Sequence, residues 1–196
     1  MQLLRAWLYG YIKPYEMIRI VSFQTNPSFG LVAVTIRGLL DSLLLYLPVY
    51  LMGRLPSQVS YLTFVDTKDY FLFLVFVSPF FFILLWLFLS GSIYLILRLT
   101  SVKHYEIDHI LNIFGVVSLI VGAFVVIWDW FWIVINSKNF IWLGVSHQII
   151  NLWSMFLITA ALKKILNIKI FYGIILTIIW ILLSIFPAIL IMKSPL

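Results

Sequence analysis

The sequence predicts an all-α integral membrane protein: a bundle of five transmembrane helices preceded by a short interfacial amphipathic helical arm. The first observation is composition, because 64% of the 196 residues are hydrophobic and only 10% are charged. Soluble domains carry about 25% charged residues. The second is the length of the apolar runs, several of which reach the roughly 20 residues that a helix needs to cross a bilayer. Lipid, not water, is therefore the expected solvent of most of the surface.

The chain divides into an arm, residues 1–30, and a membrane domain, residues 31–196. No internal repeat, low-complexity tract or soluble domain interrupts the membrane domain. Its five predicted spans are residues 31–52, 70–99, 107–135, 140–162 and 170–192.

The arm contains two short amphipathic helices. Pro14 suits the first turn of the second helix, in which Met17, Ile20 and Val21 share a face. The spacing in the first helix predicts a segment that lies in the plane of the membrane interface. Packing of both helices on the end of the bundle is an open alternative. The predicted apolar face of the first helix comprises Leu3, Leu4, Trp7, Leu8, Tyr11 and Ile12.

The first span, residues 31–52, carries Arg37 and Asp41 where lipid is expected. An unpaired charge at the bilayer centre costs about 2.5–3.5 kcal/mol on insertion scales. The spacing of i and i+4 allows the two charges to neutralise each other. One interpretation is a ligand, lipid-headgroup or proton site that faces the bundle interior. The other is a structural pair that sets how the first helix packs.

The second and third spans carry features that bear on their length and ends. Residues 70–99 would form a helix of roughly 45 Å, which exceeds the hydrocarbon thickness. We therefore expect a kink at Pro79, a tilt, or an end that projects into water. The third span ends in the segment WDWFW, residues 128–132, which is typical of an aromatic belt at a membrane surface.

Polar residues also occur on both sides of the connection between the third and fourth spans. Asp129 and His147 lie about nine residues before and after its midpoint, so antiparallel helices bring them to a similar depth. His147, Asn151 and Ser154 share one face of the fourth span. Hydrogen bonds between helices are one interpretation of this face. A second interpretation is an Asp129–His147 pair that titrates. A third is that Asp129 simply lies among the lipid headgroups.

The distribution of lysine and arginine predicts the orientation. Eight of these residues fall on the side of the N-terminus and four on the opposite side, which favours a cytoplasmic N-terminus and an outer C-terminus in a prokaryotic cell membrane. Their scatter forms no contiguous patch, so the net charge of +6 does not indicate nucleic-acid binding. The inner set is Arg5, Lys13, Arg19, Arg98, Lys103, Lys163, Lys164 and Lys169, and the outer set is Arg54, Lys68, Lys138 and Lys193.

No residue pattern in the sequence identifies a reaction. The chain has no cysteine, which removes thiolate metal sites and cysteine nucleophiles, and none of the common hydrolase or nucleotide-binding motifs occurs. The segment HYEIDH, residues 104–109, matches no specific metal-ligand spacing, and its acids suit a helix N-terminus. We therefore predict no catalytic residue, no cofactor and no metal.

Three segments resemble the Yip (Ypt-interacting protein) family, also called the Yip-one domain, in its prokaryotic form. They are IKPYEMIRIVSFQTNPSFGLVAVTIRGLL, HYEIDHILNIFGVVSLI and NLWSMFLITAALKKILNIKIFYGII. The first opens a short amphipathic helix with proline before a span, and the last contains tryptophan, small residues and a basic turn. Eukaryotic members have a longer cytosolic N-terminal region and are linked to Rab GTPases and early secretory traffic. Without that region, Rab binding is not implied here.

The leading functional hypothesis is a non-enzymatic Yip-type protein that organises membrane or binds lipids, other membrane proteins or a second copy of itself. The resemblance supplies no catalytic residues. One alternative is a small transporter or channel subunit that uses Arg37 and Asp41, although five spans without a repeat are few for a carrier. Another is a membrane enzyme that acts on lipid through Asp129, His147 or residues 104–109.

Overall fold

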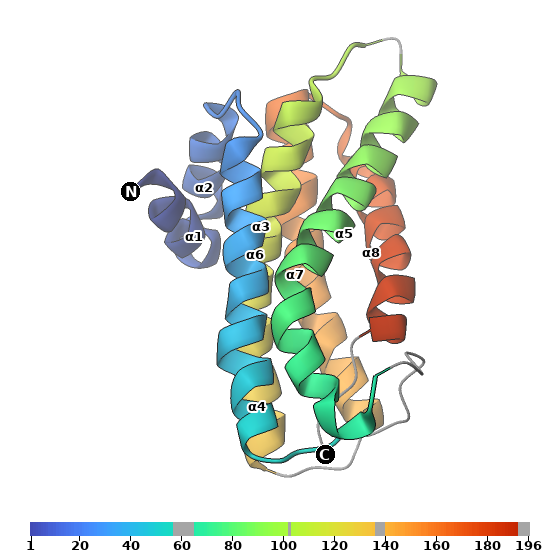
Figure 1. Cartoon of the computed structure of the whole chain (residues 1–196). Helices are drawn as coiled ribbons and strands as arrows, with labels where there is room; N and C mark the ends of the chain where they lie inside the picture. Colours follow the sequence, from blue (N-terminus) through green and yellow to red (C-terminus); the bar gives the residue numbers. More distant parts are fainter. Residues whose placement is uncertain (57–64, 102, 136–139, 192–196) are drawn as a thin grey trace.

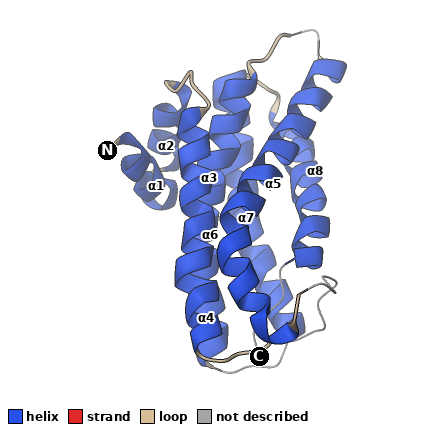
Figure 2. Cartoon of the chain, viewed as in Figure 1, coloured by secondary structure: helices blue, strands red, loops and turns tan. Residues whose placement is uncertain are grey.

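The computed structural model describes the chain except residues 57–64, 102, 136–139 and 192–196, and the side chains of residues 140–141, 186 and 188–190. Across the described ranges the protein is all-α and contains no β-strand (Figure 2). The predicted fold class is therefore confirmed as an all-α bundle. The tight connection predicted at residues 136–139 lies outside the described residues.

The observed helices match the predicted spans to within four residues at the ends that the structure describes. They are α1 (Gln2–Ile12), α2 (Pro14–Ser22), α3 (Ser28–Leu40), the π-helix η1 (Asp41–Tyr46), α4 (Leu47–Leu51), the 3-10 helix η2 (Thr67–Asp69), α5 (Tyr70–Thr100), α6 (Ile107–Val134), α7 (Phe140–Leu166) and α8 (Ile170–Ile191).

Among the residues that the structure describes, four helical stretches are long and apolar enough to cross a membrane: Ser28–Leu51, Thr67–Thr100, Ile107–Val134 and Trp142–Leu166. In α8 the apolar part with described side chains, Ile170–Ile185, is shorter. These helices run side by side in one bundle, and α5 changes direction along its length (Figure 1). This arrangement is consistent with a multi-pass membrane protein.

The helices α1 and α2 form a hairpin that packs along the side of α6. At its tip the Tyr11 hydroxyl donates a hydrogen bond to the carbonyl of Ile120, which lies 13 residues from the start of α6 at Ile107. The contacts at the two ends of the hairpin, Gln24 with Asn112 and Tyr11 with Ile120, are eight residues apart along α6, a rise of about 12 Å. A Cβ on Gly10 would lie only 2.3 Å from the Ile120 side chain. The arm approaches α6 through its small residues for this reason.

Because α1 approaches α6 so closely, the face that α1 buries differs from the predicted apolar face. Leu3 and Trp7 pack against the core, but the fully buried residues of α1 are Ala6 and Gly10. Four residues of the predicted face are exposed instead, because only small residues fit against α6; these are Leu4, Leu8, Tyr11 and Ile12. In α2 the buried residues are Met17, Ile18 and Val21.

The arm, α3 and α6 meet at the buried side chain of Asn112. Its Oδ1 accepts the N–H of Gly30 at 2.8 Å, and its Nδ2 donates to the carbonyls of Gln24 and Asn26, both at 3.0 Å. A Cβ on Gly115 would lie 2.5 Å from the carbonyl oxygen of Gly30. The two glycines thus allow α3 and α6 to cross with backbones in contact, and Asn112 satisfies the polar groups around the crossing.

Two prolines within helices leave carbonyl groups that neighbouring helices satisfy. Proline has no N–H for the carbonyl four residues earlier. For Pro79 that carbonyl belongs to Val75, and it accepts the hydroxyl of Ser42 at 2.5 Å. For Pro48 it belongs to Leu44, and it accepts the indole N–H of Trp130 at 2.6 Å. Both prolines are thereby tolerated inside the bundle.

Candidate functional site

The ion pair between Arg37 and Asp41 lies in the bundle interior. Arg37 Nη1 donates to Asp41 Oδ1, as the i and i+4 spacing predicts, and the residues are only 6% and 2% exposed. The guanidinium carbon also lies 4.6 Å from the centroid of the Phe82 ring, a cation–π distance. Asp41 is the first residue of the π-helix η1 (Asp41–Tyr46), and such single turns often occur at functional sites.

Gly122 makes room for the Arg37 side chain on α6. A Cβ added to Gly122 would lie 1.5 Å from Arg37 Nε and 1.7 Å from Arg37 Cδ. The arginine stem therefore rests directly on the α6 backbone, and any side chain at position 122 would displace it. Sequence reasoning missed this residue, because a single glycine in a long apolar run does not indicate which side chain it faces.

An inner cavity of about 330 Å³ lies beside Arg37, which is the only charged residue among the described residues that line it. Asn151, predicted as a site residue, lines the same cavity. Ile185 of α8 is 39% exposed and lines it together with the partly exposed Phe81 and Leu85 of α5, so the cavity reaches the surface between these two helices. The other polar lining residues are Ser118, Gln148 and Ser184, and most of the remaining wall is aromatic or aliphatic.

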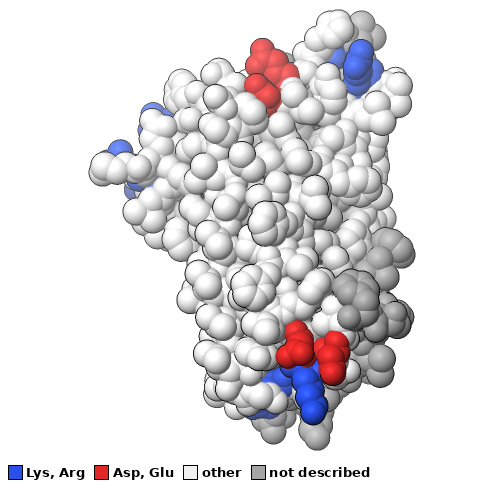
Figure 3. Space-filling model, viewed as in Figure 1, with Lys and Arg blue, Asp and Glu red and all other residues white. Residues whose placement is uncertain are grey.

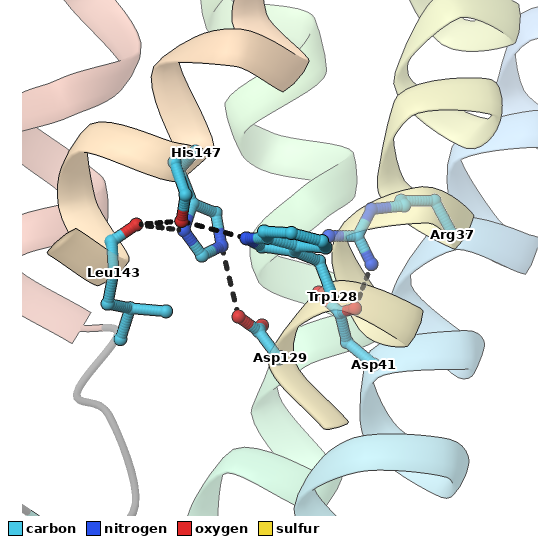
Figure 4. Close-up of polar contacts among 7 residues, drawn as sticks. Arg37, Asp41, Trp128, Asp129, Leu143 and His147 are labelled. Carbon is cyan, nitrogen blue, oxygen red and sulfur yellow. Dashed lines mark hydrogen bonds and ion pairs between the residues drawn. The ribbon is translucent and has the colours of Figure 1, made fainter. Parts of the chain in front are cut away.

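Asp129 and His147 form a second cluster where α6 and α7 face each other (Figure 4). His147 Nε2 lies 3.0 Å from Asp129 Oδ1, and His147 Nδ1 lies 2.8 Å from the Leu143 carbonyl oxygen. A carbonyl oxygen can only accept, so Nδ1 must carry a hydrogen to make that bond. When the ring is protonated, Nε2 donates to Asp129 and the contact is a hydrogen-bonded ion pair.

The surrounding aromatic residues support this second cluster. Trp128 Nε1 donates to Ser146 Oγ at 2.8 Å, and Ser146 Oγ donates to the carbonyl of Leu143 at 2.7 Å (Figure 4). Trp130 also donates a hydrogen bond, to the carbonyl of Leu44. Two indoles of the predicted aromatic belt thus bond to neighbouring helices.

The two charged clusters lie close enough to influence each other. Asp129 and Tyr46 both interact electrostatically with the Arg37 guanidinium. Along α6, Asp129 is seven residues beyond Gly122, where Arg37 rests, a rise of about 10 Å. The Asp129–His147 cluster therefore lies about two helical turns of α6 away from the Arg37 side chain.

The remaining polar segment, residues 104–109, lies at the start of α6, at the opposite end of that helix from Asp129. His109 Nε2 lies 3.4 Å from Glu106 Oε2 at the start of α6. Among the residues that the structure describes, no group of three histidine, aspartate or glutamate side chains is arranged to hold a metal ion.

Comparisons of the chain with protein families, with curated proteins and with solved structures find no match. The resemblance to the Yip family therefore stays a prediction. The two charged clusters and the inner cavity are the basis on which function can be proposed.

Proposed function

We propose that this chain is a non-enzymatic membrane protein that binds an acidic amphiphile, such as a fatty acid, in its inner cavity. The observation that carries the proposal is the position of Arg37, the only charged residue among the described residues that line an otherwise mainly apolar cavity. A guanidinium pairs well with a carboxylate or phosphate, and apolar walls suit an alkyl chain. The route between α5 and α8 would admit the amphiphile from the surrounding lipid.

The lining residues favour binding over catalysis. Ser118 and Ser184 carry hydroxyl groups, but no histidine or carboxylate is among the described residues that line the cavity with them. A serine nucleophile needs an adjacent general base for activation. We therefore assign the serines to hydrogen bonding with the bound molecule.

The proposed membrane topology has five spans, with α8 as the fifth. Its 22 residues, Ile170–Ile191, rise about 33 Å, enough to cross the hydrocarbon core. On the face in Figure 3, charged side chains lie toward the two ends and on the arm, and an uncharged band lies between. The loop charges favour a cytoplasmic N-terminus, although Lys138 and Lys193 lie outside the described residues. Leu4, Leu8 and Ile12 would then face lipid.

Photocrosslinking tests the proposal. The full chain in lipid nanodiscs is exposed to a fatty acid carrying a photoreactive group and an alkyne, or to the corresponding alcohol. The acid is expected to label peptides of α5 and α8 more strongly than the alcohol, because only the acid pairs with Arg37. The double variant Arg37→Gln, Asp41→Asn removes both charges together and should abolish this preference.

A matched control is Arg98→Gln, which removes an exposed arginine at the end of α5 and should leave the labelling unchanged. Equal labelling by acid and alcohol in the wild-type protein would refute the proposal. Preference for the acid in the double variant would refute it equally, since the charge at position 37 would then be irrelevant.

A second candidate function is a small proton-coupled transporter, which the contact between His147 and Asp129, about two helical turns along α6 from Arg37, favours. A histidine within hydrogen-bonding distance of a carboxylate is suited to accept and release a proton. Proteoliposomes containing a pH-sensitive dye would report proton flux. The variant His147→Gln should abolish the flux, and flux equal to that of the wild-type protein would exclude this function.

A further inference from the structure

A groove of about 760 Å³ lies along the exposed face of α7, on the opposite end of the molecule from Asp129. Tyr15 of α2 and Ile170 and Ile174 of α8 contribute to its walls. The α7 residues that line it recur at helical spacing and so share one face. They are Leu152, Met155, Phe156, Thr159, Ala160, Lys163 and Lys164.

The groove is apolar at one end and basic at the other. Leu152 and Phe156, which are 63% and 41% exposed, lie toward the middle of α7. Lys163 and Lys164 lie in its last turn. From Leu152 to Lys164 the helix rises about 18 Å, close to the roughly 15 Å thickness of one leaflet of the hydrocarbon core.

The basic end of the groove has charge available for a ligand. Lys163 and Lys164 are exposed, and neither makes an ion pair with any residue that the structure describes. Asn167 also lines this end and has a positive φ of 52°, which turns the chain between α7 and α8. Lys169 is exposed directly after this turn.

Cations at a helix C-terminus interact favourably with the helix dipole even when no ligand is bound. The dipole does not account for an apolar groove that continues from the cations for the depth of a leaflet. Basic pockets between helices on the cytoplasmic side are typical binding places for anionic headgroups. Charge and dimensions thus both match a lipid with a negative headgroup and a long acyl chain.

We propose that this groove binds an anionic glycerophospholipid of the leaflet at this end of the bundle. Lys163 and Lys164 bind the phosphate-bearing headgroup, and one acyl chain lies along the face from Ala160 to Leu152. The inference goes beyond the proposed function, because it uses neither Arg37 nor the inner cavity. Either site can therefore fail while the other stands.

Native mass spectrometry of the full chain in detergent tests the inference with phosphatidylglycerol and phosphatidylcholine of identical acyl chains. Each lysine near a membrane surface contributes about 1 kcal/mol to the attraction of anionic lipid. The two lysines together predict about a 30-fold preference for phosphatidylglycerol at low salt. The preference should decrease as salt is added, because salt screens exposed charges.

Three variants separate the contributions to binding. Lys163→Gln, Lys164→Gln should remove the preference, whereas Arg98→Gln, Lys103→Gln removes two exposed cations elsewhere at the same end and should retain it. Ala160→Phe fills the groove without a change of charge and should weaken binding of both lipids. Equal binding of the two lipids by the wild-type protein would overturn the inference, as would an undiminished preference after loss of both lysines.

Discussion

Replacing Asp41 with leucine should destabilise the protein by about 3–5 kcal/mol, because it leaves the buried Arg37 without its carboxylate. Arg37 is 6% exposed and its stem rests on the backbone of Gly122, so it has little room to reach water. Replacing Arg37 with methionine leaves the buried Asp41, which is 2% exposed, without its cationic partner, and should reduce stability by a similar amount.

The double variant Arg37→Met, Asp41→Leu should be destabilised by only about 1 kcal/mol, since buried ion pairs are often replaceable by apolar residues of similar volume. The loss of the cation–π contact with Phe82 accounts for a cost of that size. The measurement is reversible unfolding in mixed micelles titrated with dodecyl sulfate, followed by tryptophan fluorescence.

The matched control is the pair Glu16 and Arg19 of α2, which are 2.6 Å apart but solvent-accessible. Glu16→Gln should change stability by less than about 1 kcal/mol. A double variant at positions 37 and 41 whose loss equals the sum of the single losses would show that the two charges do not depend on each other. That result would refute the interpretation that Asp41 neutralises the buried charge of Arg37 beside the cavity.

Gly122→Ala should destabilise the protein by about 1–3 kcal/mol through displacement of Arg37; its control, Gly91→Ala, has open space around the added Cβ and should stabilise α5 by up to about 1 kcal/mol. Asn112→Ala should cost about 3 kcal/mol, because three hydrogen bonds of about 1 kcal/mol each are lost; proteolysis of the arm should accelerate. Burial raises the pKa of Tyr11 above its usual 10.0, so the unfolded chain releases this proton first and stability should decrease above pH 10. Tyr11→Phe should remove that part of the pH dependence in the same unfolding assay.

The positions of the helices could be predicted from the sequence because an apolar run must be long enough to cross a bilayer and polar residues must end it. Prediction and structure agree on the start of α5 at Tyr70, of α6 at Ile107 and of α8 at Ile170. Each start follows a polar connection in the sequence. The length of α7 was underestimated, because Lys163 and Lys164 continue its last turn instead of ending it.

Part of the candidate site could also be predicted. The i and i+4 spacing brings Arg37 and Asp41 together within one helix, and symmetry about the connection places Asp129 at the level of His147. The prolines could be located in the sequence, but the donors that satisfy their free carbonyls could not. Ser42 and Trp130 are far from those carbonyls along the chain.

Hydropathy alone was enough to predict a bundle of helices that are long and apolar enough to cross a membrane. This prediction depends only on the length and the apolar surface of each segment. Hydropathy could not establish which helix faces which. In a protein solvated by lipid both the inner and the outer faces of a helix are apolar, so periodicity does not mark the buried side. In α1, for example, the apolar Leu4 and Leu8 are exposed, whereas the small residues Ala6 and Gly10 are buried. The partners of Arg37 and Asn112 depend on backbone distances between helices, and these exist only in the folded bundle.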